Sequence, residues 1–106
     1  MDSEKFIQLL RTFVAERDWA KFHTTSNLAK SISIEAAELL EQFQWSDDFD
    51  LEEVVDELAD VLTYCLLLAD KLDVDPMAIV QAKLEKTISK YPVDLARGRS
   101  DKYDRL

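Results

Sequence analysis

Four carboxylate side chains in this sequence are spaced so that together they could bind a divalent metal ion. Glu35 and Glu38 stand three residues apart, and Glu57 and Asp60 repeat that interval further along the chain. Residues i and i+3 lie on one face of a helix. Carboxylate oxygens are donors that Mg²⁺ and Mn²⁺ prefer. The spacing therefore predicts a Mg²⁺ site, with Mn²⁺ as the second candidate ion.

The neighbours of these four acids are apolar residues rather than lysines. Carboxylates held together away from water repel one another and lose hydration, so they need either protons or a hard cation. The alternative is a solvated acidic face, because the chain has 22 Asp and Glu residues. Zinc is not expected, since the sequence has one histidine, His23, and one cysteine, Cys65.

Apolar residues recur at helical spacing, and no segment shows the alternation of a strand. The predicted fold is all-α, with helices over about 3–17, 27–43, 50–71 and 75–90. Asp50 and the Asp75-Pro76 pair are typical helix starts. Residues 1–106 are predicted to form a single domain, with a partly irregular tail over 92–106.

The third predicted helix is apolar around nearly its whole circumference. Between Leu58 and Ala69, only Asp60, Thr63 and Tyr64 interrupt the apolar surface. Helices of this kind are interior helices, and a four-helix chain has difficulty enclosing one of its own. The pattern therefore predicts a homo-oligomer that associates through apolar helix faces.

Composition and charge exclude several classes of function. The 106 residues include 13 Lys and Arg against 22 Asp and Glu, a formal net charge of −9. That balance argues against binding a nucleic acid polymer or an anionic membrane surface. A single glycine rules out glycine-rich phosphate loops. With one cysteine and no leader-like segment, the expected location is the cytoplasm.

Several short motifs together resemble one known family. They are RDWAKFH at 17–23, NLA at 27–29, FQW at 43–45, ELADVLTY at 57–64, KYPV at 90–93 and KY at 102–103. With the two acidic pairs, they are similar to motifs of the all-α nucleoside triphosphate pyrophosphohydrolases, the MazG-like group. The most similar part of that group is its dCTP pyrophosphatase subgroup.

The resemblance implies a four-helix MazG-like bundle that assembles as a dimer of dimers with sites at subunit boundaries. It implies Mg²⁺-dependent hydrolysis of a nucleoside triphosphate to the monophosphate and pyrophosphate, in nucleotide-pool sanitation. The metal ligands would be Glu35, Glu38, Glu57 and Asp60. Glu35 and Glu38 would be the catalytic glutamates, and we favour Glu38 as the base that deprotonates the attacking water.

The same resemblance implies a set of substrate contacts. Trp19 and Trp45 would stack on the base, His23 and Asn27 would reach its edge, and Tyr64 would contact the sugar or a metal-bound oxygen. Sugar and phosphate contacts would come from Lys83, Thr87, Lys90, Tyr91 and Lys102. For the tryptophans and Tyr64, packing in the core is the alternative interpretation.

The preferred substrate is expected to be dCTP or a related, including modified, pyrimidine nucleotide. Leu10, where some dCTP-preferring relatives have His, leaves the choice of base open. Thr87, where relatives often have Asn, leaves the contacts to sugar and phosphate open. The alternatives are a base-tolerant hydrolase, a dUTP-type hydrolase, and a non-enzymatic acidic helical interaction module.

Overall fold

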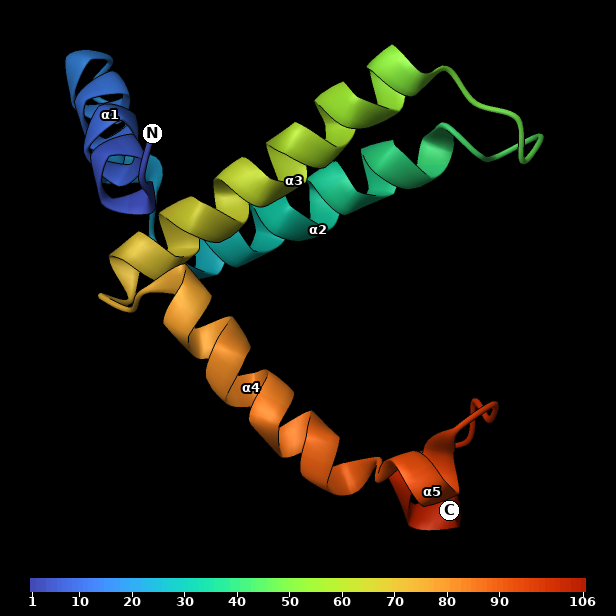
Figure 1. Ribbon diagram of the computed structural model, residues 1–106. Helices are drawn as coiled ribbons and strands as arrows, with labels where there is room; N and C mark the ends of the chain where they lie inside the picture. Colours follow the sequence, from blue (N-terminus) through green and yellow to red (C-terminus); the bar gives the residue numbers. More distant parts are fainter. The chain divides into compact units, whose positions relative to one another are not determined.

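The structure, a computed structural model, describes residues 1–106 and is entirely helical, which confirms the predicted all-α fold class. None of the helices combines the length and apolar character needed to cross a membrane. Figure 1 shows the helices in chain order. Their bounds are α1 Ser3–Glu16, η1 Ala20–Phe22, α2 Thr25–Glu41, α3 Leu51–Lys71, α4 Pro76–Lys90, α5 Val93–Ala96 and η2 Tyr103–Arg105, where η denotes a 3₁₀ turn.

Each of the four long helices begins at a residue whose side chain accepts a hydrogen bond from a first-turn amide. The backbone amides of a first turn have no partner within the helix, so such caps fix where it starts. The pairs are Asp2 with the Lys5 amide, Thr24 with Asn27, Asp50 with Glu53, and Asp75 with Ala78, over 2.8–3.1 Å.

Replacing Asp50 with alanine should lower the free energy of unfolding by about 1 kcal/mol, because the Glu53 amide loses its acceptor at the start of α3. Chemical denaturation at fixed protein concentration measures this change. Asp50→Asn keeps an acceptor and should stay within a few tenths of a kcal/mol of the parent. Equal losses in both variants would show that the carboxylate charge, rather than the cap, matters.

The helix boundaries differ from the predicted ones mainly at α2. This helix starts at Thr25 because Thr24 is its cap, and it ends at Glu41, two residues early. Phe43 leaves the helix and packs its ring against Phe49 at a centroid distance of 5.4 Å. Two short elements, α5 and η2, lie within the tail that was predicted to be partly irregular.

The chain divides into two compact units, residues 1–73 and 74–106. In the first unit, α2 and α3 lie side by side and antiparallel, joined by residues 42–50, and α1 packs against α3 (Figure 1). The buried hydrophobic residues are Val14, Leu28 and Ala69. Large apolar side chains elsewhere on these helices, including Leu58 and Leu62 of α3, remain exposed.

A tight turn after α1 is built around Asp18, whose φ of 54° lies in the left-handed region. The Asp18 amide donates to the Ala15 carbonyl and the Trp19 amide donates to the Val14 carbonyl, each over 3.1 Å. This is a Schellman-type helix end, which usually has glycine at the left-handed position. The turn directs the chain from α1 into Trp19 and η1.

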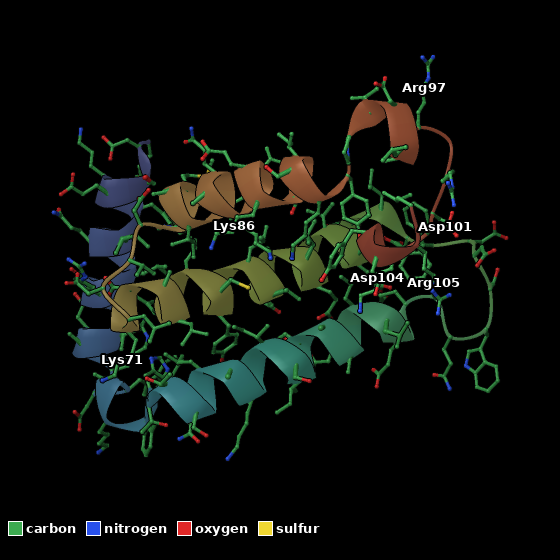
Figure 2. All side chains as sticks on the ribbon, turned by 90° about the horizontal axis from the view of Figure 1, so that it is seen from below. Lys71, Lys86, Arg97, Asp101, Asp104 and Arg105 are labelled. Carbon is green, nitrogen blue, oxygen red and sulfur yellow. The ribbon has the colours of Figure 1, made fainter.

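In the second unit, the tail folds back on the end of α4. The Tyr91 hydroxyl accepts a hydrogen bond from the Tyr103 amide over 3.2 Å, and the two rings meet edge to face at 6.3 Å. The Lys90 ammonium lies 4.7 Å from the centre of the Tyr103 ring. In Figure 2, the side chain of Arg97 points away from the Asp101–Arg105 turn. The contacts of the Tyr103 ring with Tyr91 and Lys90 anchor the tail to the end of α4.

Candidate metal centre

The two acidic pairs lie opposite each other, at the same position along the α2–α3 hairpin. Glu35 lies six residues before the end of α2, and Glu57 lies six residues after the start of α3. Because the helices are antiparallel, equal offsets from the connecting loop place these two positions opposite each other. Carboxylate oxygens of Glu35, Glu57 and Asp60 all lie within 4.8 Å of one another. Glu38, three residues after Glu35 on α2, lies close enough to this cluster to raise the pKa values of Glu35 and Glu57.

Two oxygens of the cluster are buried without a hydrogen-bond partner, Oε2 of Glu35 and Oε2 of Glu57. A buried polar atom without a partner costs about 1–3 kcal/mol, and more when it is charged. Such oxygens are expected where a cation replaces water. The donors are all oxygens, which is the set that Mg²⁺ and Mn²⁺ prefer, so the residues fit the predicted ion.

The surroundings raise the pKa values of two of these carboxyls. The pKa of Glu35 rises from 4.5 to about 7, mainly through its hydrogen bond with Glu38, then through loss of hydration and repulsion by the other acids. The pKa of Glu57 is also raised, mainly by loss of hydration and then by the negative charges of Glu38 and Asp60. Both shifts have the sign expected for anions that lack a cation.

Thermal stability of the metal-free protein should therefore fall as the pH rises from about 5 to about 8. A carboxyl with a raised pKa in the folded state favours folding while it is protonated, and this contribution is lost as the pH passes through about 7. Melting curves in EDTA measure the effect. Glu35→Gln should give a flatter pH profile, and identical slopes for variant and parent would contradict this assignment.

A cavity of about 240 Å³ adjoins the acids between α1 and α3. Asp60 belongs both to the acidic cluster and to the wall of this cavity, which we call the α1–α3 cavity. Three predicted substrate contacts, Trp19, His23 and Tyr64, line it. The remaining lining residues are Leu10, Phe13, Val14, Thr63 and Leu67. A flat ring in this cavity would lie directly beside the acidic cluster.

Trp19 forms one wall of the α1–α3 cavity. Its indole meets the Phe13 ring edge to face, with the centroids 5.6 Å apart, and the side chain is 44% exposed. The guanidinium of Arg17 covers the Phe13 ring at 3.9 Å. Trp19 is thus supported from one side while much of its surface remains available for stacking.

Asn27 lies outside the α1–α3 cavity, in a wider depression that it shares with His23, Lys30 and Tyr64. Its side-chain Nδ2 donates to the Phe22 carbonyl over 3.0 Å. The side-chain N–H of Asn27 therefore stabilises η1, and its side-chain oxygen is free to accept a hydrogen bond.

Trp45 is not brought near Trp19 within the first unit. Trp45 follows α2, whereas Trp19 precedes this helix. The helix spans 17 residues, or about 25 Å. The Trp45 side chain is 89% exposed. The two predicted aromatic walls are therefore at opposite ends of the hairpin in one chain.

The other predicted contacts belong to the second unit. Lys83, Thr87 and Lys90 are on α4, and Tyr91 and Lys102 follow it. The Thr87 hydroxyl donates to the Lys83 carbonyl over 3.1 Å, within its own helix. Residues 74–106 hold seven of the 13 basic residues and five of the 22 acidic ones, which gives this unit a net charge of +2 in an otherwise acidic chain.

Sequence reasoning did not select Thr63 and Leu67 as site residues, although both line the α1–α3 cavity. They follow Asp60 by three and seven residues on α3, so helical spacing could have identified them. The residues from α1 could not be found in this way, because they depend on how α1 packs against α3.

Fold and site together define an all-α protein in which a helical hairpin presents a cluster of carboxylates beside an aromatic cavity. Comparison with known proteins gives the family. The model of the MazG-like family matches residues 30–106. This match covers most of the chain, and the chain belongs to the MazG-like family.

Individual relatives are similar over almost the whole chain. The identity is 36% with dCTP pyrophosphatase 1 of Homo sapiens and 35% with that of Bos taurus, in each case over 97% of this chain. The chain spans about two thirds of those relatives' lengths, 66% and 67%. A crystal structure of a pyrophosphatase from Archaeoglobus fulgidus matches with a TM-score of 0.77 and 47% identity, covering 84% of this chain and 91% of that one.

Proposed function

We propose that this protein is a Mg²⁺-dependent nucleoside triphosphate pyrophosphohydrolase that releases the nucleoside monophosphate and pyrophosphate. One observation carries the proposal: Asp60 joins a cluster with unpartnered buried carboxylate oxygens to a cavity with an aromatic wall. Oxygen ligands and a flat-walled cavity suit a metal-bound triphosphate joined to a base. The names of the matched relatives support the same reaction class.

In this mechanism, Glu35, Glu57 and Asp60 would hold the metal, and Glu38 would complete the ligand set. The bound ion supplies positive charge that offsets the triphosphate and increases the acidity of water. Glu38 is our candidate for the general base, since it adjoins the cluster but is not one of the three residues whose oxygens converge.

The substrate base would occupy the α1–α3 cavity, stacked on Trp19, with its edge toward His23 and Tyr64. Asn27 would contribute its free oxygen from the neighbouring depression. Lys83, Lys90, Tyr91 and Lys102 are proposed to contact phosphates, and Thr87 to contact sugar or phosphate. The positive charge of residues 74–106 favours an anionic ligand.

We further propose that the protein is a cytoplasmic tetramer, built as a dimer of dimers, that keeps the nucleotide pool clean. The first unit buries few apolar residues, and α4 exposes Met77, Val80, Leu84 and Ile88. Sites at subunit boundaries would explain why Trp19 and Trp45 are separated within one chain. Sedimentation velocity measures the assembly directly.

The preferred substrate is proposed to be dCTP or a related pyrimidine nucleotide. The test is release of pyrophosphate from a panel of nucleoside triphosphates, with Mg²⁺ and with EDTA. Turnover with Mg²⁺ that is highest for dCTP supports the proposal. Similar turnover for all bases would favour the base-tolerant alternative, and the largely apolar lining of the cavity makes this the second candidate. Preference for dUTP, or inertness in every condition, would support the dUTP-type hydrolase or the interaction module respectively.

A further inference from the structure

A two-pronged ion pair joins α1 to α3 across 59 residues of sequence. The Arg11 Nε lies 3.1 and 3.0 Å from the two carboxylate oxygens of Asp70, and a second guanidinium nitrogen donates to the same carboxylate. The Asp70 side chain is only 24% exposed. A planar guanidinium that binds a carboxylate through two nitrogens fixes orientation as well as distance. This pair therefore constrains how α1 lies on α3.

The pair lies close behind the α1–α3 cavity. Arg11 and Asp70 line a second cavity of about 200 Å³, and Val14, His23 and Leu67 line both cavities. On α1, Arg11 stands between two wall residues of the first cavity, Leu10 and Phe13. On α3, Asp70 is three residues beyond the wall residue Leu67. The ion pair is thus about one helical turn or less from the walls on both helices.

The separation of α1 from α3 decides how large a ring the α1–α3 cavity accepts. Leu10, Phe13 and Val14 form its wall on α1, and Thr63, Tyr64 and Leu67 form its wall on α3. A purine is larger than a pyrimidine by one fused ring, so an outward movement or tilt of α1 would help the cavity to admit it. That movement would break the contacts between Arg11 and Asp70.

We propose that Arg11 and Asp70 form a positioning pair that sets the width of the α1–α3 cavity and thereby favours pyrimidine over purine triphosphates. This inference rests on the proposed function. Neither residue needs to touch the nucleotide, since each acts through the helix that carries it.

The test is charge reversal, comparing Arg11→Asp, Asp70→Arg and the double variant. The readout is the ratio of kcat/KM for dCTP to kcat/KM for dATP, with Mg²⁺. A smaller folded fraction lowers both values equally and leaves their ratio unchanged, so the ratio separates positioning from stability. We expect each single variant to lower the ratio about tenfold, equivalent to about 1.4 kcal/mol, and the double variant to restore most of it.

Two further variants complete the set. Lys5→Glu reverses a charge on α1 that has no ion-pair partner on α3, and it should leave the ratio unchanged. Arg11→Gln removes the charge with a smaller perturbation, and it should shift the ratio in the same direction if a reversal variant does not fold. An unchanged ratio in the single variants, or no recovery in the double variant, would overturn the inference.

A second measurement needs no nucleotide. In a Trp45→Phe background, Trp19 is the sole tryptophan, and it lines the α1–α3 cavity. Acrylamide quenching of its fluorescence should increase in both single variants and return toward the parent value in the double variant. If the parent protein releases pyrophosphate from no nucleotide, the proposed function fails before any variant is compared. If the parent is active but neither ratio nor quenching changes, the positioning inference alone fails.

Discussion

Replacing Glu57 with glutamine should reduce Mg²⁺-dependent pyrophosphate release about 100-fold or more. The variant keeps the size of the side chain but removes a negative oxygen that is buried and has no partner in the protein. Metal ions contribute several kcal/mol to reactions of this kind, and each 1.36 kcal/mol is a factor of ten in rate. Initial rates over a series of Mg²⁺ concentrations measure the loss.

The matched control is Glu41→Gln, on the same hairpin. Glu41 is exposed at the end of α2 and lies outside the acidic cluster. It should keep nearly all of the parent activity. If both variants lose activity equally, general electrostatics rather than metal binding explains the effect. If Glu57→Gln remains active at ordinary Mg²⁺ concentrations, the proposed ligand set is wrong.

Glu38→Gln tests the assignment of the base separately. It should lower kcat strongly while Mg²⁺ binding, followed by calorimetry, weakens less than in Glu57→Gln. The reason is that Glu38 would add to a ligand set supplied mainly by Glu35, Glu57 and Asp60, whereas the base is needed in the chemical step itself. Unchanged turnover in Glu38→Gln would rule out Glu38 as the base.

Replacing Trp19 with alanine should raise KM by about tenfold to a hundredfold with a smaller change in kcat. Stacking of a base on an aromatic side chain contributes about 1–3 kcal/mol, and this interaction is present before the chemical step as well as during it. Steady-state kinetics with dCTP measures both constants. Trp19→Phe keeps a ring on the cavity wall and should recover part of the affinity.

The edge-to-face contact between Trp19 and Phe13 gives the alanine variant a second effect, a loss of stability. Thermal melts of both Trp19 variants separate this loss from the loss of stacking. If Trp19→Ala lowers the melting temperature and kcat but leaves KM unchanged, Trp19 is a packing residue. That result would restore the interpretation of this tryptophan as part of the core.

Local patterns in the sequence were sufficient to predict the helices. Each long helix begins within two residues of its predicted start and has a side-chain cap, because caps depend on residues three apart. The acidic pairs were found for the same reason. The position of the two acidic pairs opposite each other also depends on their equal distances from the connecting loop. These distances can be counted in the sequence.

The α1–α3 cavity could not be predicted, because it depends on contacts between distant residues. Arg11 and Asp70 are both ordinary charged helix residues, and nothing local to either one indicates its partner. Likewise, the turn η1 and the contact between Tyr91 and Tyr103 are set by backbone geometry and by packing of the tail. Helical periodicity carries no information about the η1 turn or about the contact between Tyr91 and Tyr103.

The left-handed conformation of Asp18 has a consequence for the affinity of the site. The hydrogen bonds of this turn tie the Trp19 amide to α1, and the Phe13 ring supports the indole, so the proposed stacking surface is positioned without a ligand. A ring that is already ordered loses little conformational entropy when a base stacks on it. Most of the stacking energy is then retained as binding energy. The strain of placing a residue other than glycine at this position is the same with and without ligand, so its cost falls on stability and not on affinity.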